Sequence, residues 1–472
     1  MTNDEAVSSF VLIKTHLMDL CLQGEPGGVL PSVRQLVRDF EVSPVTVSKV
    51  IAELSLEGFI EARPGHGTFI RERRSDFRDI DFDWQSLVLG SPPAPSMNNL
   101  VMEAPPGCLN FANGYMDDSL LPERELARAS ARVLRSSTAW QRAPLGGLFD
   151  LQKWFAVRAA SGFPADDVLI VQGGQAALGI AIRAIVPAGG TLLVESPTYL
   201  GPLVIARAAG IKLAPVPVDR EGMRADHLKS ALERGPVQAI YLQPTFSNPS
   251  GVSLSSERRL AIFELARQHN SFIIEDDYAR DLSFDGQVPT PLFGQDEGHV
   301  VYVRSLTKSI APSLRVAALC AQGPVLSRLR SALLVNDFFV PRPLQEIAVE
   351  FLSSSSYGKH LKKLQASFHT RMNLACELVE GRLPGCRVHP PEGGYSLWVS
   401  LPEDMDEDAL CRAAEERGVI VNPGHWWFAA EPVGKHLRLS IAGLTEGDLP
   451  TAVARLGSAM KDVRRAQQVG TC

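Results

Sequence analysis

The stretch Ser305–Arg315, which reads SLTKSIAPSLR, is the most informative about the fold of this 472-residue chain. It follows the apolar run Val300–Val303, so Lys308 is expected in a loop at the carboxyl end of a strand. Open α/β sheets bind their ligands at that end. A lysine there can form a Schiff base with an aldehyde, and the arginine seven residues later suits a phosphate. The alternative is a solvated surface lysine.

Similar strand-like runs recur on both sides of this stretch. They are Val168–Val171, Thr191–Val194, Lys212–Val216, Ala239–Leu242, Phe272–Ile274, Val300–Val303 and Arg315–Cys320. Helical segments such as Gln175–Ile185 and Glu257–His269 separate most of them. This alternation predicts an α/β fold, with a mostly parallel sheet that helices cover on both faces.

Two turns after these runs carry small or amide side chains. GGQAAL, residues 173–178, leads from a strand into a helix, where glycines let the backbone approach a phosphate at the helix N-terminus. QPTFSNPSG, residues 243–251, follows Ala239–Leu242 and contains common turn pairs. An ordinary turn is the alternative for either motif taken alone.

Acidic, aromatic and basic side chains follow other runs. In EDDY, residues 275–278, carboxylates directly follow a strand-like run and could pair with a protonated group of a ligand. In ESPTY, residues 195–199, the tyrosine could stack on a flat ring. In LRLS, residues 437–440, the arginine could bind a carboxylate. A charged strand end, a core tyrosine and a surface arginine are the alternatives.

In this order the motifs resemble those of the fold type I pyridoxal-phosphate (PLP) enzymes, the aminotransferase superfamily. The resemblance implies that Lys308 is the catalytic lysine that binds the cofactor, and that Arg438 holds the α-carboxylate of a substrate or effector. It implies Asp276, rather than Asp277, as the partner of the ring nitrogen. The full set of implied cofactor-binding residues is Lys308, Gly174, Gln175, Tyr199, Asn248, Asp276, Tyr278, Ser305 and Arg315.

One position departs from the family pattern. Members often carry a tyrosine three residues before the proline of a Gly-Asp-Pro-x-Gly stretch, and it reaches the phosphate of the neighbouring subunit. The matching stretch here is QRAPLG, residues 141–146, so Gln141 stands in that place. A glutamine can still donate a hydrogen bond.

The first 72 residues follow a different, helix-rich pattern. A first helix carries apolar residues that include Val11, Ile13 and Leu17. Ser32 and Ser43 are expected N-caps of two further helices. The second of these carries Val47, Val50, Ile51 and Leu54 on one face and ends near Gly58. Two β-prone runs around the turn RPGHG, residues 63–67, then predict a hairpin.

This order of three helices and a hairpin resembles the winged helix-turn-helix of GntR-type regulators. The resemblance implies that the helix from Ser43 enters the major groove of DNA. The implied DNA contacts are Arg34, Thr46, Ser48 and Lys49, with Arg63 and His66 on the wing. Many relatives have arginine where this chain has Pro44. The alternative is a helical accessory domain that contacts protein.

Together the two parts resemble the MocR subfamily of bacterial regulators. The expected domains are a winged helix over residues 1–72, a linker over 73–105 and an aminotransferase-like domain over 106–472. Its large domain covers about 135–340, and the remaining C-terminal part forms the small domain. The middle of the linker, around Phe82, Trp84 and Leu87, is apolar enough to pack on a neighbour.

Composition narrows the remaining possibilities. The net charge is −6, and the first 75 residues carry eight Lys/Arg and ten Asp/Glu, so DNA binding depends on where particular residues lie. The seven cysteines are scattered without metal-binding spacing, so no metal site is expected. No secretory signal or membrane-spanning stretch is visible, which favours a cytoplasmic protein.

Three functions fit these observations. The first is a homodimeric transcription regulator that binds a double-stranded operator and senses PLP or an amino compound. The second is a PLP-dependent aminotransferase with an accessory winged helix, so enzymatic turnover is left open. The third is an architectural DNA-binding protein whose C-terminal domain only dimerises. We favour the first, because a scaffold needs no Lys308 or Asp276 and a metabolic enzyme needs no wing.

Overall fold

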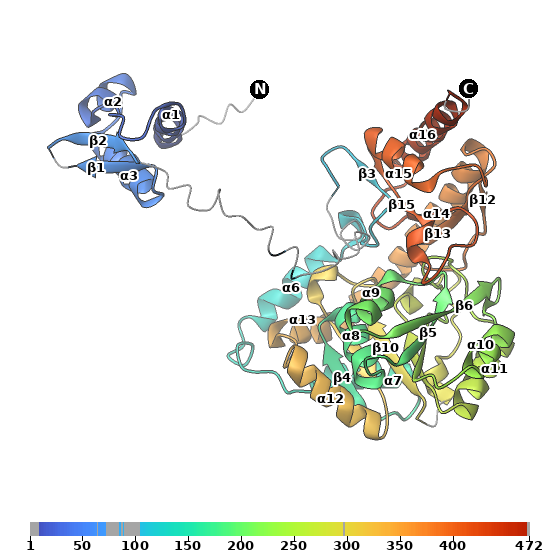
Figure 1. Ribbon diagram of the computed structural model, residues 1–472. Coiled ribbons are helices and arrows are strands. Elements are labelled where there is room, and N and C mark those ends of the chain that lie inside the picture. The colour runs from blue at the N-terminus through green and yellow to red at the C-terminus, as the bar shows by residue number, and fades with distance from the viewer. Residues whose placement is uncertain are drawn as a thin grey trace. The chain divides into compact units, whose positions relative to one another are not determined.

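The computed structural model describes residues 9–63, 65–71, 85, 88, 104–295 and 298–469. The chain divides into two compact units, Met1–Pro93 and Ala94–Cys472 (Figure 1). Most of the predicted linker, including Phe82, Trp84 and Leu87, lies outside the described residues. Pro64, at the predicted wing turn, does so as well.

The N-terminal unit contains three helices and one hairpin. They are α1 (Ser9–Gln23), α2 (Val33–Asp39), α3 (Pro44–Leu56), β1 (Ile60–Arg63) and β2 (Gly67–Ile70). The predicted N-caps are confirmed, because the Ser32 hydroxyl accepts a hydrogen bond from Gln35 N at 3.3 Å and the Ser43 hydroxyl accepts one from Thr46 N at 3.2 Å. The strands pair antiparallel, with Ile60 opposite Ile70, which confirms the hairpin.

The core of this unit forms between α1 and α3. Val47, Val50, Ile51 and Leu54 of α3 are all buried, as predicted, and they pack with Ile13 and Leu17 of α1. Val11 was wrongly grouped with these residues, because its side chain is 49% exposed. It lies two residues before Ile13, which is about 200° around the helix and therefore on the opposite face.

An eight-stranded sheet forms the centre of the second unit. Its order is β4-β11-β10-β9-β8-β5-β6-β7, and neighbouring strands from β10 to β6 are parallel. The prediction of a mostly parallel sheet is confirmed. The strands are β4 (Val168–Val171), β5 (Thr191–Ser196), β6 (Lys212–Asp219), β7 (Gly222–Met223), β8 (Ala239–Leu242), β9 (Phe272–Asp276), β10 (Val300–Ser305) and β11 (Ala317–Cys320).

The last predicted strand starts later than the sequence suggested. Arg315 was assigned to a run ending at Cys320, but β11 begins at Ala317. Arg315 has a φ of 49°, in the left-handed region, so its backbone cannot continue a strand. This turn after the 3-10 helix Pro312–Leu314 places the arginine ahead of the strand.

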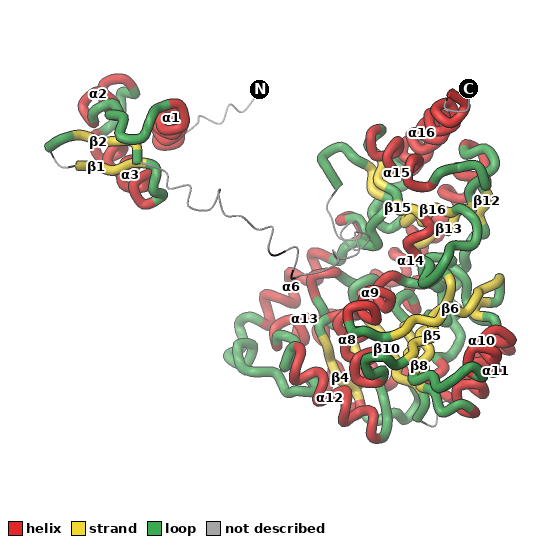
Figure 2. The backbone as a smooth tube through the Cα atoms, viewed as in Figure 1, coloured by secondary structure: helices red, strands yellow, loops and turns green. Residues whose placement is uncertain are grey.

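Helices cover both faces of this sheet, as Figure 2 shows. Side chains alternate along each strand: Val168 and Ile170 of β4 join one hydrophobic cluster, whereas Leu169 and Val171 join the other. The helices of this unit up to residue 352 are α6 (Glu123–Val133), α7 (Phe149–Ala159), α8 (Gly173–Ile185), α9 (Leu200–Ala208), α10 (Ala225–Leu232), α11 (Ser256–Gln268), α12 (Pro324–Asn336) and α13 (Arg342–Leu352).

A smaller sheet and three helices follow toward the C-terminus. The sheet has the order β12-β13-β16-β15, and its pairs are antiparallel. A separate parallel pair joins β3 (Leu109–Asn110) to β14 (Val419–Ile420), so residues near 110 belong to this smaller part. The remaining elements are α14 (Ser355–Arg382), β12 (Arg387–Val388), β13 (Ser396–Ser400), α15 (Glu407–Glu416), β15 (Asn422–Pro423), β16 (His436–Ser440) and α16 (Leu449–Val469).

Short 3-10 helices complete the described elements. Besides Pro312–Leu314 they span Asp118–Leu120, Ala165–Asp167, Arg280–Leu282, Leu292–Gln295 and Gly424–Trp427. Over the described ranges, none of the helices combines the length and the apolar character that a bilayer span needs. The same ranges contain no group of His, Cys, Asp and Glu side chains suited to a metal ion.

Candidate cofactor site and DNA-binding surface

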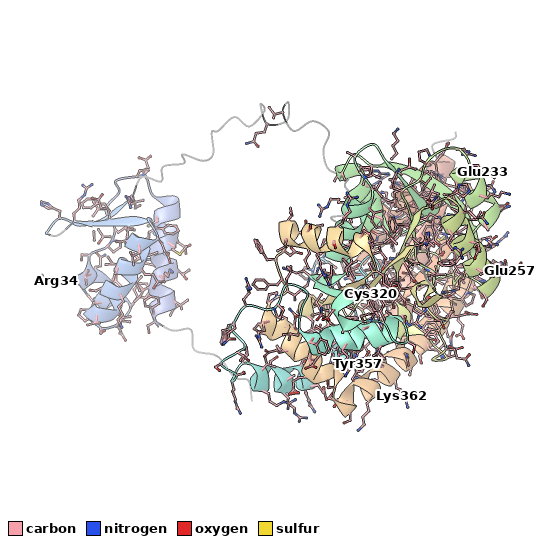
Figure 3. All side chains as sticks on the ribbon, turned by 90° about the horizontal axis from the view of Figure 1, so that it is seen from below. Arg34, Glu233, Glu257, Cys320, Tyr357 and Lys362 are labelled. Atoms are coloured by element: carbon pink, nitrogen blue, oxygen red, sulfur yellow. The ribbon has the colours of Figure 1, made fainter. Side chains whose placement is uncertain are left out.

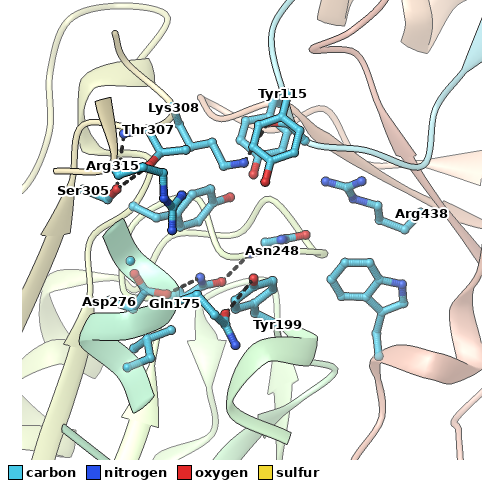
Figure 4. Close-up of a pocket in the computed structure, with 17 residues that line it drawn as sticks. Tyr115, Gln175, Tyr199, Asn248, Asp276, Ser305, Thr307, Lys308, Arg315 and Arg438 are labelled. Carbon is cyan, nitrogen blue, oxygen red and sulfur yellow. Dashed lines mark hydrogen bonds between the residues drawn. The ribbon is translucent and has the colours of Figure 1, made fainter. Parts of the chain in front are cut away.

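A cavity of about 390 Å³ lies where the large sheet meets the smaller C-terminal part (Figure 4). All ten residues that the sequence predicted for the cofactor and for a carboxylate line it. They are Gly174, Gln175, Tyr199, Asn248, Asp276, Tyr278, Ser305, Lys308, Arg315 and Arg438. The cavity is also lined by Gly114, Tyr115, Leu178, Gln243, Thr307, Tyr395 and Trp427.

The parallel sheet explains why distant sequence motifs meet here. Strands β5, β8, β9 and β10 are parallel, so their carboxyl ends share one edge of the sheet. Asp276 is the last residue of β9 and Ser305 the last of β10, while Tyr199 and Asn248 lie in the loops after β5 and β8. The smaller part closes the other side with Arg438 from β16.

Lys308 has an amine suited to reaction near neutral pH. Its Nζ donates a hydrogen bond to the Gly114 carbonyl at 3.0 Å and lies 4.1 Å from the centre of the Tyr115 ring. Burial, together with the positive charges of Arg438 and Arg315, lowers the pKa of Lys308 to about 7. A neutral amine is the nucleophilic form, so this environment activates the lysine.

Arg438 is a buried cation without an acidic partner. Its side chain is only 2% exposed, and it donates to the Ala112 carbonyl at 2.8 Å and to the Ser396 hydroxyl at 3.1 Å. Its Nε has no hydrogen-bond partner, and no ion pair of Arg438 occurs among the described residues. Because an unpaired buried charge is costly, the arrangement favours an anionic ligand.

The N-terminus of α8 forms one wall with Arg315. Gln172, at the N-cap, makes no side-chain capping hydrogen bond, and its carbonyl accepts one from Arg315 Nη2 at 2.9 Å. Gly173 has a φ of 83°, and a Cβ there would lie 2.7 Å from the Arg315 guanidinium. Free backbone N–H groups beside a guanidinium suit a phosphate. The Ser305 hydroxyl donates to the Thr307 hydroxyl at 3.0 Å, next to this wall.

Asp276 is held by two hydrogen bonds on one oxygen. The Tyr241 hydroxyl and the Gln243 amide each donate to Asp276 Oδ2 at 2.8 Å. Burial raises the pKa of Asp276 to about 6, and the two donors counteract part of that rise. Asp277 is on the other face, where its Oδ2 accepts hydrogen bonds from Tyr302 and Arg280, so Asp276 is the carboxylate that reaches the cavity.

The remaining predicted side chains are oriented by their neighbours. Asn248 Oδ1 accepts a hydrogen bond from Ser396 at 3.2 Å, which leaves its amide N–H groups as donors. The Tyr278 hydroxyl donates to the Phe246 carbonyl at 2.8 Å. The Tyr199 hydroxyl donates to Gln175 at 3.1 Å.

Sequence reasoning missed several lining residues. Gln243 begins the predicted turn but was not singled out, and its side chain also accepts a hydrogen bond from Asn248 N at 2.8 Å. Thr307 lay inside the most informative motif and was passed over. Tyr115, Tyr395 and Trp427 carry no motif, and only the fold brings them to the cavity.

The N-terminal unit exposes most of the predicted DNA contacts. Arg34, Ser48, Lys49 and His66 are exposed, and Figure 3 shows Arg34 at the edge of this unit. Thr46 is half-buried, and its hydroxyl is 2.9 Å from that of Ser43.

On the wing, the exposed Arg63 already has partners. Its guanidinium donates two hydrogen bonds to Glu61, at 3.2 and 3.0 Å, and lies 4.8 Å from the centre of the Phe69 ring. A role of Arg63 on DNA therefore competes with this intramolecular ion pair.

Comparison with known proteins decides the family. The family model described as aminotransferase class I and II matches residues 109–456, which is most of the chain. The chain belongs to the aminotransferase class I and II family. A second model, described as bacterial regulatory proteins of the gntR family, matches residues 13–70. The predicted MocR-type combination, a GntR-type winged helix ahead of an aminotransferase-like domain, is thereby confirmed.

Relatives that match along the whole chain are named as regulators. The uncharacterized HTH-type transcriptional regulator YdfD of Bacillus subtilis (strain 168) is 28% identical over 454 residues, which are 93% of this chain and 92% of that protein. The HTH-type transcriptional regulator NorG of Staphylococcus aureus (strain USA300) is 24% identical over 450 residues, which are 92% of this chain and 100% of that protein. These relatives, named as regulators, thus match this chain over both the GntR-type part and the aminotransferase-like part.

A solved aminotransferase structure resembles the second unit. LysN, an alpha-aminoadipate aminotransferase from Thermus thermophilus, matches with a TM-score of 0.75 and 29% identity, over 79% of this chain and 96% of its own. That crystal structure contains N-(5'-phosphopyridoxyl)-L-leucine. Family membership and this neighbour indicate PLP as the cofactor.

The residues present fit such a cofactor. Lys308 offers an amine with a lowered pKa, and Arg315 beside the uncapped N-terminus of α8 suits a phosphate. Asp276 presents a buried carboxylate to the same cavity. Lys308, Arg315 and Arg438 also line it, and none of them forms an ion pair with an acidic side chain among the described residues. Arg438 Nε has no hydrogen-bond acceptor among the described residues, so it can bind a second anion besides the phosphate.

Proposed function

We propose that this regulator senses PLP or an amino compound in its aminotransferase-like domain and thereby changes its affinity for an operator. The observation that carries the proposal is the set of three basic side chains, Lys308, Arg315 and Arg438, that line one cavity without an ion-pair partner among the described residues. A site of this kind has no evident purpose in a DNA-binding scaffold. The relevant domains are residues 1–72, a linker over 73–105 and residues 106–472.

The proposed cofactor contacts follow from the geometry of each side chain. Arg315, Ser305, Gly174 and Gln175 would hold the phosphate end, where a guanidinium, a hydroxyl and the N-terminus of α8 meet. Asp276 would pair with the protonated ring nitrogen.

Three further side chains would face the ring. Asn248 and Tyr278 would approach its oxygen, and Asn248 has amide hydrogens to donate. The Tyr278 hydroxyl would have to turn away from the Phe246 carbonyl to do the same. Tyr199 would stack on the ring face.

The chain's own groups then determine what chemistry is available. When bound, PLP supplies an aldehyde that captures amines and a ring that withdraws electrons. Lys308 provides an amine that competes with an incoming amino compound for this aldehyde. Because its pKa is lowered, a large fraction of this amine is neutral at pH 7. Asp276 would hold a proton at the ring nitrogen, and Arg438 would hold the carboxylate of an incoming amino compound.

The DNA-binding part of the proposal concerns single residues. Thr46, Ser48 and Lys49 lie in the first turns of α3, the proposed recognition helix, and Arg34 lies in α2. Arg63 and His66 on the wing would contact the DNA backbone or minor groove.

We also propose that the protein is a cytoplasmic homodimer. The segment around Gln141 exposes Trp140, Leu145 and Phe149, with 75%, 37% and 57% of their surface accessible, which is typical of an interface with another chain. Gln141 is itself exposed and could reach a neighbouring site. Two winged helices would then read paired half-sites.

The first test is the visible absorption spectrum of the full-length protein with added PLP, beside the Lys308→Ala variant. We expect a band of bound cofactor that the variant lacks. Operator affinity is then measured with and without PLP and amino compounds. If affinity never changes, the sensor proposal is wrong. Sustained turnover of an amino acid without any change on DNA would favour the alternative, an aminotransferase with an accessory winged helix.

A further inference from the structure

Several residues that line the cavity have no role in the proposed contacts with the cofactor or, through Arg438, with a carboxylate. Two polar side chains of that remainder are already hydrogen-bonded, Gln243 to Asp276 and Thr307 to Ser305. Its other side chains are Tyr115, Leu178, Tyr395 and Trp427. Three of them are aromatic and one is aliphatic. Leu178, Tyr395 and Trp427 are almost fully buried, with 2%, 3% and 0% of their surface exposed.

These aromatic rings surround the anchor for a carboxylate. The Arg438 guanidinium lies 5.6 Å from the centre of the Tyr395 ring and 5.3 Å from the Trp427 ring. Lys308 Nζ lies 4.1 Å from the Tyr115 ring and 5.6 Å from the Tyr395 ring. A ligand that places its carboxylate at Arg438 and its amine near Lys308 therefore has its side chain among these rings, and Figure 4 shows Tyr115 beside Lys308.

The wall is fixed by contacts from other elements. The Trp427 carbonyl accepts a hydrogen bond from Thr198 N at 2.8 Å, which ties the C-terminal part to the loop that carries Tyr199. Tyr395 packs edge-on against Tyr278, with ring centres 5.8 Å apart. A Cβ on Gly114 would lie 2.8 Å from the Tyr395 hydroxyl, so the tyrosine has little room to move away.

Charge is the second feature of this wall. In the part of the chain that the structure describes, the charged side chains lining the cavity are Asp276, Lys308, Arg315 and Arg438. Each already has a proposed task toward the cofactor or the carboxylate. The nearby buried acid Glu195 does not line the cavity, and it accepts hydrogen bonds from Gln243 N and Ser247. No oppositely charged group among the described residues of this chain is therefore left for a charged ligand side chain, and burying such a charge unpaired is unfavourable.

We propose that the effector is an amino acid with a single carboxylate and an uncharged, apolar or aromatic side chain. This inference rests on the proposed sensor function and narrows its ligand. Contact with the aromatic rings favours apolar atoms in the side chain of the ligand, whereas an acidic or basic group there would be buried without a partner and is disfavoured. We expect apolar amino acids to bind at least about 100-fold more tightly than dicarboxylic or dibasic ones, at 1.4 kcal/mol for each factor of ten.

The test is a titration of the full-length, PLP-loaded protein with single amino acids, followed by the visible absorption of the cofactor. The probes are L-phenylalanine, L-leucine, L-glutamate and L-lysine, with L-phenylalaninamide as a control that lacks the carboxylate. Phenylalanine or leucine should change the spectrum at much lower concentration than glutamate or lysine, and the amide should be weak because Arg438 then has no anion to bind.

Different outcomes refute different statements. If glutamate or lysine binds as tightly as phenylalanine, the inference about the side chain is wrong while the sensor proposal stands. If no amino acid changes the spectrum of the loaded protein, amino-compound sensing itself fails.

A variant tests the placement of the wall. Tyr115 is partly exposed, so Tyr115→Arg is tolerable sterically and should shift the preference toward glutamate by roughly two- to fivefold. An unchanged ratio of glutamate to phenylalanine affinity would show that Tyr115 does not face the ligand's side chain.

Discussion

Replacing Tyr241 with phenylalanine deletes one of the two hydrogen bonds that hold Asp276. Tyr241 is fully buried on β8, and its hydroxyl is 2.8 Å from Asp276 Oδ2. The substitution keeps the ring and its packing. A hydrogen bond to a charged group contributes about 1.5–3 kcal/mol, which corresponds to roughly one to two pKa units. The pKa of Asp276, about 6 in the unsubstituted protein, should therefore rise to roughly 7–8 in the variant.

The consequence is a defect in PLP binding that depends on pH. Burial holds the pKa of Asp276 above its usual value, and the lost donor raises it further. Between pH 6 and 8 a larger fraction of the free variant is therefore protonated at Asp276, and this proton must leave before the carboxylate can pair with a protonated ring nitrogen. Linkage predicts roughly 5- to 50-fold weaker binding at pH 6 and less than about 1.5-fold at pH 8.5.

The assay is a PLP titration, followed by visible absorption, at several values from pH 6 to 8.5. The matched control is Tyr302→Phe on β10, because Tyr302 is equally buried and its hydroxyl donates to the adjacent Asp277 at 2.7 Å. The control should bind PLP like the unsubstituted protein at every pH. A defect of equal size in both variants, or one independent of pH, would refute the proposed role of Tyr241.

Three further outcomes are expected. The rate of PLP capture, measured by stopped-flow absorption, should rise with pH and level off above about pH 7 to 8, because Lys308 reacts as a neutral amine. A rate that continues to rise up to pH 10 would contradict the lowered pKa of Lys308. Glu61→Gln should strengthen DNA binding several-fold in a fluorescence assay at low salt, because Arg63 loses its intramolecular acid; unchanged binding would exclude Arg63 as a contact. Ser43→Ala should reduce the free energy of unfolding of the N-terminal unit by about 1 kcal/mol in a denaturant titration, because the cap of α3 is lost. Ser55→Ala, whose hydroxyl has no hydrogen-bond partner among the described residues, should change it less.

Local sequence determined the elements and their order. The caps at Ser32 and Ser43 were readable because a serine before an apolar periodic segment satisfies backbone N–H groups within three residues. The strands were readable because buried parallel strands are short apolar runs, and the residues at their carboxyl ends must converge at one edge of the sheet. For the same reason, the nine residues predicted for the cofactor reached one cavity, whereas Arg438 reaches it from β16 of the smaller sheet.

Contacts between residues that are far apart in the chain were determined only by the tertiary structure. Gln243 and Tyr241 act on Asp276 from a neighbouring strand, and nothing in the spacing of these residues specifies which oxygen they share. Tyr395 and Trp427 reach the cavity only because the C-terminal part packs beside the large sheet. Likewise the pKa of Lys308 is lowered by burial and then by Arg438, which is 130 positions away in the chain. Pattern and capping act over a few residues, whereas burial and charge act through space, and only the folded chain determines those distances.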